Sequence, residues 1–550
     1  MVRDIRQPVL IIATSNNEVW AIRPSALATD LLWPKVVLGP PLVASKEKGV
    51  KPKGANCAIG PNEAWQEWTT LGQGRPNGLV GIEATPVVDL ANNQVLVGFK
   101  TADGHQRLAA IDLNDGRWKS VEVPAPHAAA NPDWHKLHRN RASLLLADGV
   151  VYLAFSSLCE GEHQKMHGSI VAFDARTLRH VSDGEFQVTD DKTDGGGIWQ
   201  GATGLAADTR GNLYFITGNR RLRAPCLVGF DDRNDPDAAN LANSVIRLKS
   251  DKRGAGGMPP RPGEKYKVKM TVEDYFTPYR KMLGDCWDLD LGSSGALLIP
   301  GSRFVVAGGK EGIIYVLDRA DMGGFDNAGV RWSFDFVKPL FNTDTHRHNE
   351  VPDDPKRDRV QQKFQAGVNQ YDADYLLKDL ARWPHIHGTP VFARFVGGQS
   401  FMFVWPEKDW IKRYRWRGDR FDPAPRLGSA LAPPFVKDNL NGMPGGMLSV
   451  NVDPNGPSLG VVFASVKICN DSVHHHNDRV HHHLEPGFPD CATDQNRGIL
   501  RAYDPFTMHE VWSNRDESYW FSKFVPPTVA NGRVFLPTAS GKVLIYGNRR

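Results

Sequence analysis

The sequence has few cysteines, no long apolar run and almost no excess of either charge. Only six cysteines occur in 550 residues and none forms a CxxC or CxxCH motif, which excludes zinc-ribbon, thioredoxin-like and c-type haem sites. No window approaches about 18 consecutive apolar residues, so we expect no membrane-spanning helix. The 66 Lys and Arg residues against 62 Asp and Glu leave a net charge of +4, too small to predict nucleic acid as a partner.

The N-terminus also lacks the pattern of a secretion signal. Its first residues lead directly into the strand-like run 8–13, without a separate hydrophobic segment and small-residue cleavage site, so no signal peptide is visible. The even number and wide spacing of the cysteines nevertheless favour disulfides and an oxidising compartment, with reduced thiols as the alternative. We therefore expect a periplasmic or extracellular protein. The cysteines are Cys57, Cys159, Cys226, Cys286, Cys469 and Cys491.

Glycine and proline, by contrast, are abundant. The chain has 53 glycines and 38 prolines, about one residue in six, against a background of about 12%. Hydrophobic residues make up 41% of the sequence, which is enough for a substantial core. This composition argues against long helices and predicts many short strands joined by turns. The chain is too long for one ordinary compact domain, but all-β barrels and propellers exceed the usual domain length.

One pattern recurs along the chain: a short β-branched run, a polar turn, and a second run that usually ends in an aliphatic or aromatic residue followed by Asp. Alternation within the runs and turn residues between them predict an antiparallel hairpin for each copy. We find eight copies. They span 9–22, 94–112, 150–174, 212–248, 304–318, 400–414, 460–504 and 534–547.

The hairpins are flanked by further strand signals. A small residue or proline and an aliphatic run precede several of them, as at 84–88, 388–392 and 527–530, and a lone tryptophan on a polar strand follows others. Inner strand, hairpin and outer strand make a four-stranded blade, and radial repetition of blades is a propeller. We predict one all-β propeller over 1–550 with eight blades, seven being the alternative. The surplus length falls in insertions at about 220–243, 250–285, 340–383 and 468–495. The following tryptophans are Trp118, Trp332 and Trp512.

The stretch Asp112-Leu-Asn-Asp-Gly-Arg-Trp118 resembles the tryptophan-docking repeat of the quinoprotein (PQQ-like) propellers. The resemblance covers nearly the whole chain. Within 195–320 the sequence is similar to the pyrroloquinoline-quinone alcohol dehydrogenases. Elsewhere, as in Pro384-His-Ile-His-Gly-Thr-Pro-Val391, it resembles a secreted bacterial PQQ-like propeller group without a settled activity.

The resemblance implies roles for several residues. Trp199 matches the tryptophan that stacks under the quinone, and Asn219, in a Thr-Gly-Asn turn, matches a calcium ligand. Structurally, an indole offers a flat apolar face and an amide oxygen suits a hard cation such as Ca²⁺. The alternative is that Trp199 belongs to the propeller core and that Asn219 is only a turn residue.

A second set follows in the next predicted blade. Asp288, in Cys286-Trp-Asp288, matches the general base that removes the substrate proton next to the calcium ion, and Lys310 matches the residue that binds the quinone carbonyls. The alternative is a structural ion pair between Asp288 and Lys310 at the propeller mouth.

Other matches rest on position alone. Glu160 and Glu162 lie near the expected calcium-binding glutamate, and Arg139 and Arg141 near the arginine that holds the cofactor. Lys523 and the Gly-Gly turn at 445–446 are expected at the channel mouth. The sequence departs from the dehydrogenases in having no two adjacent cysteines.

The 18 histidines are not explained by this resemblance. In His385-Ile-His387 both rings lie on one face of an extended segment that begins an inner strand, so both can reach the central channel. Two triplets, 474–476 and 481–483, lie in the insertion between Cys469 and Cys491. Histidine-rich segments bind Zn, Cu or Ni, and His385 and His387 are the best-placed pair. The alternative is that these histidines are only solvated.

We therefore expect a quinoprotein-type oxidoreductase, in which PQQ and Ca²⁺ oxidise an alcohol or sugar hydroxyl and a redox partner protein accepts the electrons. One alternative is a His-ligated metal-dependent enzyme or metal-binding protein on the same propeller. The other is a non-catalytic scaffold that binds proteins or glycans, because the fold alone does not determine function.

Overall fold

A computed structural model of the 550-residue chain shows an all-β protein. Nearly all of its regular structure is β-strand, and the helical segment α2 (Trp134–Leu137) is a single turn. The structure describes residues 8–23, 30–44, 78–126, 134–157, 166–190, 194–220, 230–231, 240–254, 258, 260, 264–279, 281, 284–285, 289–326, 331–332, 357–367, 385–407, 409–429, 444–453, 460–467, 497–514 and 517–547. No helix in these ranges is long and apolar enough to cross a membrane.

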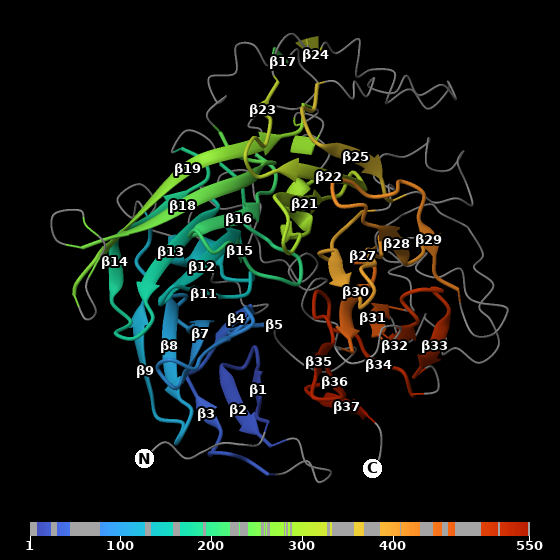
Figure 1. The fold of residues 1–550 in the computed structure, drawn as a ribbon. Helices are drawn as coiled ribbons and strands as arrows, with labels where there is room; N and C mark the ends of the chain where they lie inside the picture. Colours follow the sequence, from blue (N-terminus) through green and yellow to red (C-terminus); the bar gives the residue numbers. More distant parts are fainter. Residues whose placement is uncertain are drawn as a thin grey trace. The chain divides into compact units, whose positions relative to one another are not determined.

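In the described ranges the strands form eight successive antiparallel sheets of three to five strands, which are the blades of a β-propeller, and two further sheets of two strands each (Figure 1). The all-β, eight-bladed propeller predicted from the sequence is confirmed. The chain divides into two compact units. Unit 1 contains Met1–Trp68, Pro76–Pro225 and Asn234–Lys281, and unit 2 contains Thr69–Arg75, Cys226–Arg233 and Met282–Arg550.

Unit 1 holds the first four blades, and each predicted hairpin in it is a pair of adjacent antiparallel strands. In blade 2, for example, β7 and β8 pair from Gln94 opposite Asp112 to Lys100 opposite Gln106. Its strands are β1 (Leu10–Ala13), β2 (Glu18–Ile22), β3 (Val36–Val37), β4 (Leu42–Ala44), β5 (Gly78–Val80), β6 (Val87–Asp89), β7 (Gln94–Lys100), β8 (Gln106–Asp112), β9 (Trp118–Glu122), β10 (His138–Arg139), β11 (Leu145–Ala147), β12 (Val150–Ser157), β13 (Ser169–Asp174), β14 (His180–Gln187), β15 (Ala206–Ala207), β16 (Asn212–Ile216), β18 (Val245–Arg253) and β19 (Lys267–Thr277).

The fourth blade contains the longest strand pair of this unit. β18 and β19 are hydrogen-bonded from Val245 opposite Phe276 to Arg253 opposite Lys267. β19 falls inside the range 250–285 that the sequence analysis assigned to an insertion. Much of that range therefore completes a blade.

Unit 2 holds the last four blades. Its strands are β17 (Phe230–Asp231), β20 (Leu297–Leu298), β21 (Phe304–Gly308), β22 (Ile313–Asp318), β23 (Gly324–Phe325), β24 (Arg331–Trp332), β25 (Gln362–Gln365), β26 (Val391–Arg394), β27 (Ser400–Val404), β28 (Lys412–Arg415), β29 (Arg426–Leu427), β30 (Met447–Val452), β31 (Gly460–Lys467), β32 (Arg497–Tyr503), β33 (Glu510–Ser513), β34 (Tyr519–Trp520), β35 (Thr528–Ala530), β36 (Arg533–Pro537) and β37 (Val543–Gly547). Trp332 lies on β24, which pairs with β17, whereas β25 is the outer strand of that blade.

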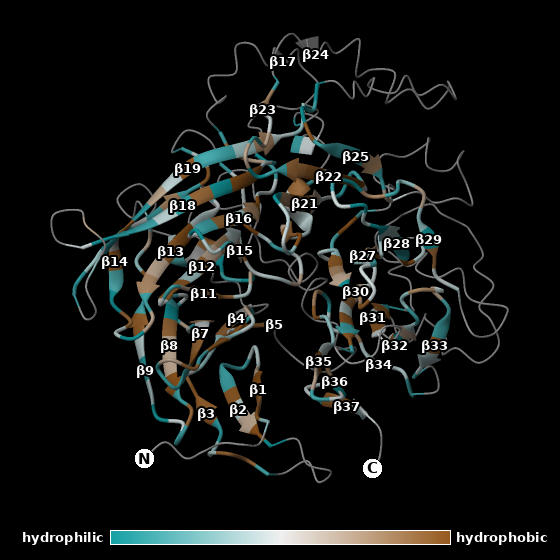
Figure 2. Cartoon of the chain, in the orientation of Figure 1, coloured by the Kyte–Doolittle hydropathy of each residue, from teal (hydrophilic) through white to brown (hydrophobic). Residues whose placement is uncertain are grey.

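The core lies between neighbouring blades. Central strands such as β7 and β27 are buried along their whole length, as their nearly continuous apolar sequences predict (Figure 2). In unit 2, Val306 and Val316 of one blade form a cluster with Met402 and Val404 of the next. Such packing fixes the ends of adjacent strands relative to each other, and the candidate site in unit 2 is built at those ends.

Candidate functional site

His385 and His387 lie on a backbone segment that is anchored on both sides of Ile386. The Ile386 N–H donates to Gly309 O at 3.2 Å, and Ser293 Oγ donates to Ile386 O at 2.7 Å. The Ile386 side chain is fully buried in the core between the two blades. With Ile386 held in this way, the two imidazoles lie together, with ring centroids 5.6 Å apart.

Glu407 joins them from the turn that follows β27. Its backbone N–H donates to His385 O at 2.8 Å, which holds the turn against the histidine segment. Gly445 packs against this turn with φ +79°, and a Cβ there would lie 2.4 Å from Trp405 O and 3.1 Å from Glu407 N. The close approach that places Glu407 therefore requires glycine at 445.

We call His385, His387 and Glu407 the His–Glu cluster. Glu407 Oε1 lies 2.8 Å from His387 Nε2, and Glu407 Oε2 lies 3.7 Å from His385 Nδ1. One ligand atom from each residue lies within 4.8 Å of the others. In a tetrahedral site with bonds of about 2.1 Å, ligand atoms are about 3.4 Å apart, so small rotations bring this set to metal-binding distances. The three side chains are 15%, 3% and 6% exposed, so the site is largely shielded from water.

An aromatic ring and a lysine lie beside the cluster. The ring of Phe524 is centred 6.0 Å from that of His387, and Lys523 Nζ lies 5.2 Å from the centre of the Phe524 ring. Phe524 has a φ of +62°, which is rare for a bulky residue. Lys523, which the sequence analysis expected at the channel mouth, thus contacts the aromatic ring that lies next to His387.

Lys310 forms a buried ion pair with Asp290, with Nζ 2.8 Å from Oδ2. Its backbone N–H also donates to Asp290 O, and the preceding residue, Gly309, accepts the bond from Ile386. Lys310 is therefore connected to the histidine segment through one backbone hydrogen bond. Asp288, which the sequence analysis considered as a partner of Lys310, lies outside the described residues.

In unit 1 the structure brings together three of the residues predicted to bind a cofactor. The Arg141 guanidinium lies 4.7 Å from the centre of the Trp199 ring. Asn219 is nearby, because Gly196 N–H donates to Asn219 O at 2.8 Å. The Asn219 side-chain oxygen accepts a bond of 2.7 Å from Asn243 Nδ2. An amide oxygen has two lone pairs, so one such atom can accept a hydrogen bond and also bind a hard cation.

Arg139 binds a different partner. Its Nε and Nη2 donate to the two carboxylate oxygens of Glu83 at 3.1 and 2.7 Å, and both side chains are buried. This bidentate geometry is typical of a strong structural ion pair. Arg139 is thus already bound to a carboxylate, whereas Arg141 covers a flat ring.

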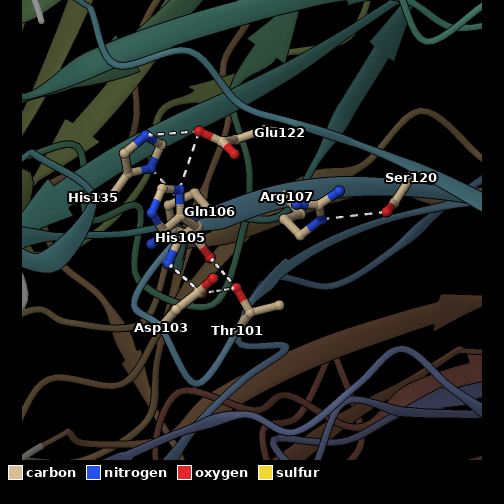
Figure 3. A network of polar contacts seen from close by, with 8 residues as sticks. All are labelled: Thr101, Asp103, His105, Gln106, Arg107, Ser120, Glu122 and His135. Carbon is tan, nitrogen blue, oxygen red and sulfur yellow. Dashed lines mark hydrogen bonds and ion pairs between the residues drawn. The ribbon is translucent and has the colours of Figure 1, made fainter.

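Unit 1 contains a second group of two histidines and a glutamate (Figure 3). His105 Nδ1 lies 3.1 Å and His135 Nε2 lies 3.6 Å from Glu122 Oε1, and the two rings are stacked at 4.6 Å. The Gln106 N–H donates to His135 Nδ1, so the proton of a neutral His135 is on Nε2, facing Glu122.

The electrostatics of this group favour a neutral His135. Burial, and then the charge of His105, lower the pKa of His135 to about 4, so the ring is neutral at pH 7. Metal binding at Nε2 would require the other tautomer and the loss of the Gln106 bond. The group in Figure 3 is therefore better suited to hydrogen bonding than to holding a metal ion.

Several predicted residues lie outside the described part of the chain. Glu160, Glu162 and Asp288 are among them, as are both histidine triplets and all six cysteines. Their roles, and the disulfides, stay predictions. Conversely, sequence reasoning missed Glu407, Asp290 and Phe524. Glu407 could have been suspected from its place in a polar turn directly after the apolar strand 400–404.

No protein-family model matches the chain, and no curated protein is significantly similar to it. Among solved structures it is similar to the quinohemoprotein alcohol dehydrogenase ADHIIG from Pseudomonas putida HK5, with 16% identity over 98% of this chain and 63% of that one and a TM-score of 0.40. A europium-containing methanol dehydrogenase gives 13% identity, 98% and 76% coverage and a TM-score of 0.37. BamB from Moraxella catarrhalis gives 9% identity over 99% of this chain and 95% of that one, with a TM-score of 0.42. The chain thus spans less than two thirds of the length of ADHIIG, and these similarities assign no role to any residue.

Proposed function

We propose that the protein binds a divalent transition-metal ion, Zn²⁺ in the first instance, at the His–Glu cluster. The observation that carries this proposal is the convergence of two imidazoles and one carboxylate within 4.8 Å in a buried place. Two histidines and one glutamate are the protein ligands of one class of catalytic zinc site, in which a fourth position is left for water or substrate. A His₂-carboxylate set also binds non-haem iron.

A metal ion held by three protein ligands can do chemistry as well as stabilise the fold. It lowers the pKa of a bound water towards neutrality and polarises carbonyl or phosphoryl oxygens. We therefore propose a metal-dependent enzyme whose ion has an open position. Binding of the ion is tested first, because any chemistry at the site depends on it.

The test is calorimetric titration of Zn²⁺ into chelator-treated protein. His387→Ala and Glu407→Ala should each remove one binding event or weaken it by at least about tenfold. His509→Ala, which removes an exposed histidine of the same unit, is the matched control and should bind as the parent does. Unchanged stoichiometry and affinity in both cluster variants would refute the proposal. Ions bound elsewhere, as by the histidine triplets, cancel in this comparison.

A second candidate is the quinoprotein-type oxidoreductase, which the contact between Arg141 and Trp199 favours. PQQ is a flat tricarboxylate, so it would use an indole face for stacking and a guanidinium for its charge. Asn219 would contribute an oxygen to Ca²⁺. When bound, the cofactor would accept the electrons from an alcohol or sugar, and these residues would only hold it.

Reconstitution tests this candidate. PQQ and Ca²⁺ are added to the protein, bound quinone is followed by its absorbance, and an alcohol panel is assayed with an artificial electron acceptor. Trp199→Leu should abolish the bound absorbance, whereas Trp118→Leu, at a tryptophan that is 43% exposed in the same unit, should not. If the parent protein retains no quinone after gel filtration, this function is excluded.

A further inference from the structure

We propose that the outer strands of the sixth blade carry a separate anion site, at which Arg413, Arg415 and Arg426 bind a phosphate or sulfate group. We call these three residues the arginine cluster. They lie on β28 and β29, the two outer strands of their sheet (Figure 1). The proposal depends neither on the His–Glu cluster nor on a metal ion. It is carried by the strand register, the charge balance and a buried donor without a partner.

The register places the three side chains on one face of the sheet. Arg413 pairs directly with Arg426 across the two strands, and Arg415 is two residues further along β28 and so points to the same side. Directly opposite side chains begin with their Cβ atoms about 4.5–5.5 Å apart, and side chains two residues apart begin about 7 Å apart. Because arginine side chains are about as long as these separations, their guanidinium groups can contact one anion.

Two of the guanidinium groups reach neighbouring points of the same loop. The Arg413 guanidinium lies over the Phe401 ring, 4.3 Å from its centre, and its Nη1 donates to Phe506 O at 2.5 Å. Arg426 Nε donates to the next carbonyl, Thr507 O, at 2.7 Å. Consecutive residues are only about 3.8 Å apart at their Cα atoms. The loop thus holds the two positive groups close together at the outer margin of the blade.

The arginine cluster carries an excess of positive charge. None of its three side chains forms an ion pair within the described ranges. By contrast, two other arginines of the same hairpin are paired, Arg417 with Asp422 and Arg420 with Asp419. The negative charge of Asp504 acts on the cluster. Three arginines and one aspartate leave a balance of two positive charges, which matches the charge of a phosphate or sulfate dianion.

Both the repulsion and the buried donor favour a bound counter-ion. Like charges directly opposite each other on an antiparallel pair are destabilising. Burial, and then the charges of Arg426 and Arg415, lower the pKa of Arg413, so the fold holds this cation against two unfavourable effects. Arg413 Nε is also buried without a hydrogen-bond partner in the part of the chain that the structure describes. Such a donor is costly, and guanidinium groups bind oxyanions through two parallel N–H groups.

The test is calorimetric titration of sodium phosphate and, separately, sodium sulfate into the chelator-treated 550-residue chain, at an ionic strength held constant with sodium chloride. Chelation removes metal ions that would themselves bind phosphate. We expect one saturable binding event with at least one of the two anions. Arg415→Gln should weaken it by at least about fivefold, because it removes one charge-assisted contact. Arg420→Gln removes the same charge from a 68% exposed side chain of the same hairpin and should leave the affinity unchanged.

Urea unfolding shows whether the Arg415→Gln variant folds as the parent does. The Arg415 side chain forms no hydrogen bond or ion pair with another described residue, so we expect the parental stability. Arg426→Gln is a second variant that should also weaken the anion. The proposal is overturned if neither anion binds saturably, if Arg415→Gln and Arg426→Gln bind as the parent does, or if Arg420→Gln loses as much affinity as they do. Binding of phosphate alone or of sulfate alone supports the proposal and identifies the anion.

Discussion

Gly445 offers a way to displace Glu407, a proposed metal ligand, without substituting it. An added Cβ at this position would meet three backbone atoms of the Glu407 turn: Trp405 O at 2.4 Å, Pro406 C at 3.0 Å and Glu407 N at 3.1 Å. Ordinary contact begins at 3.4 Å, so Gly445→Ala must move the turn. Backbone cannot give way as the end of a flexible side chain can. The turn carries Glu407, and its movement should open the His–Glu cluster.

The magnitude follows from two separable costs. A left-handed backbone costs alanine about 1–2 kcal/mol. Overpacking against fixed atoms costs a further 1–3 kcal/mol or so. Gly397 is a matched control, because its φ of +88° is similar but no heavy atom lies within 4 Å of its Cβ position. Gly397→Ala should therefore show only the first cost, and the difference between the variants measures the clash.

Urea unfolding of the chelator-treated proteins gives the two losses of stability, and calorimetric titration gives the Zn²⁺ affinities. We expect Gly445→Ala to be the less stable variant and to bind Zn²⁺ about 10–100-fold more weakly, as when a residue that positions a ligand is lost. Gly397→Ala should bind Zn²⁺ as the parent does. Equal stability of the two variants, together with parental Zn²⁺ affinity in both, would refute the reasoning.

Two further predictions concern buried charge. Glu510→Gln leaves the guanidinium of Arg501 buried beside a neutral side chain, and it should lower the free energy of unfolding in urea by about 3–5 kcal/mol. Asp422→Asn breaks an exposed pair with an arginine and should lower it by less than about 1 kcal/mol. Similar losses in the two variants would contradict this prediction. Burial lowers the pKa of His138 to about 3, so the folded protein resists a proton that the unfolded chain takes up below about pH 6.5. The free energy of unfolding should be highest above that pH and fall towards pH 3, and the fall should be smaller in His138→Gln. If urea unfolding shows the same loss of free energy between pH 7.5 and pH 5 in the parent and in His138→Gln, this role of His138 is excluded.

The fold could be predicted because each blade is specified locally. The two central strands of a blade are adjacent in sequence, carry nearly continuous apolar runs and are joined by turn residues, so their pattern can be recognised without tertiary information. Outer strands are harder. β19 is largely polar and partly exposed, and its sequence did not distinguish it from an insertion. β25 follows its blade only after a long intervening segment, and the tryptophan strand β24 was taken in its place.

The candidate site was only half predictable, for a different reason. His385 and His387 are separated by a single residue, so the pair can be recognised directly in the sequence. Glu407 comes from the turn after β27, the second strand after the motif, and its contact with His387 depends on how β26 and β27 are paired and on the approach of Gly445. Sequence alone gives no register of this kind. The sequence analysis considered an ion pair of Lys310 with Asp288, which lies outside the described residues, and did not single out Asp290, the described partner of Lys310.

Buried charge alone does not identify a functional site in this protein. Unit 2 buries the pairs Lys310–Asp290, Lys412–Asp409 and Arg501–Glu510, and in each a carboxylate faces a lysine or an arginine. Glu407 is equally buried but faces two imidazoles, which are neutral unless they bind a proton. A carboxylate removed from water needs a compensating positive charge. At the His–Glu cluster a proton or a metal ion bound by the imidazoles would supply that charge. This requirement, rather than burial, distinguishes the cluster from its structural neighbours and makes metal binding the first property to measure.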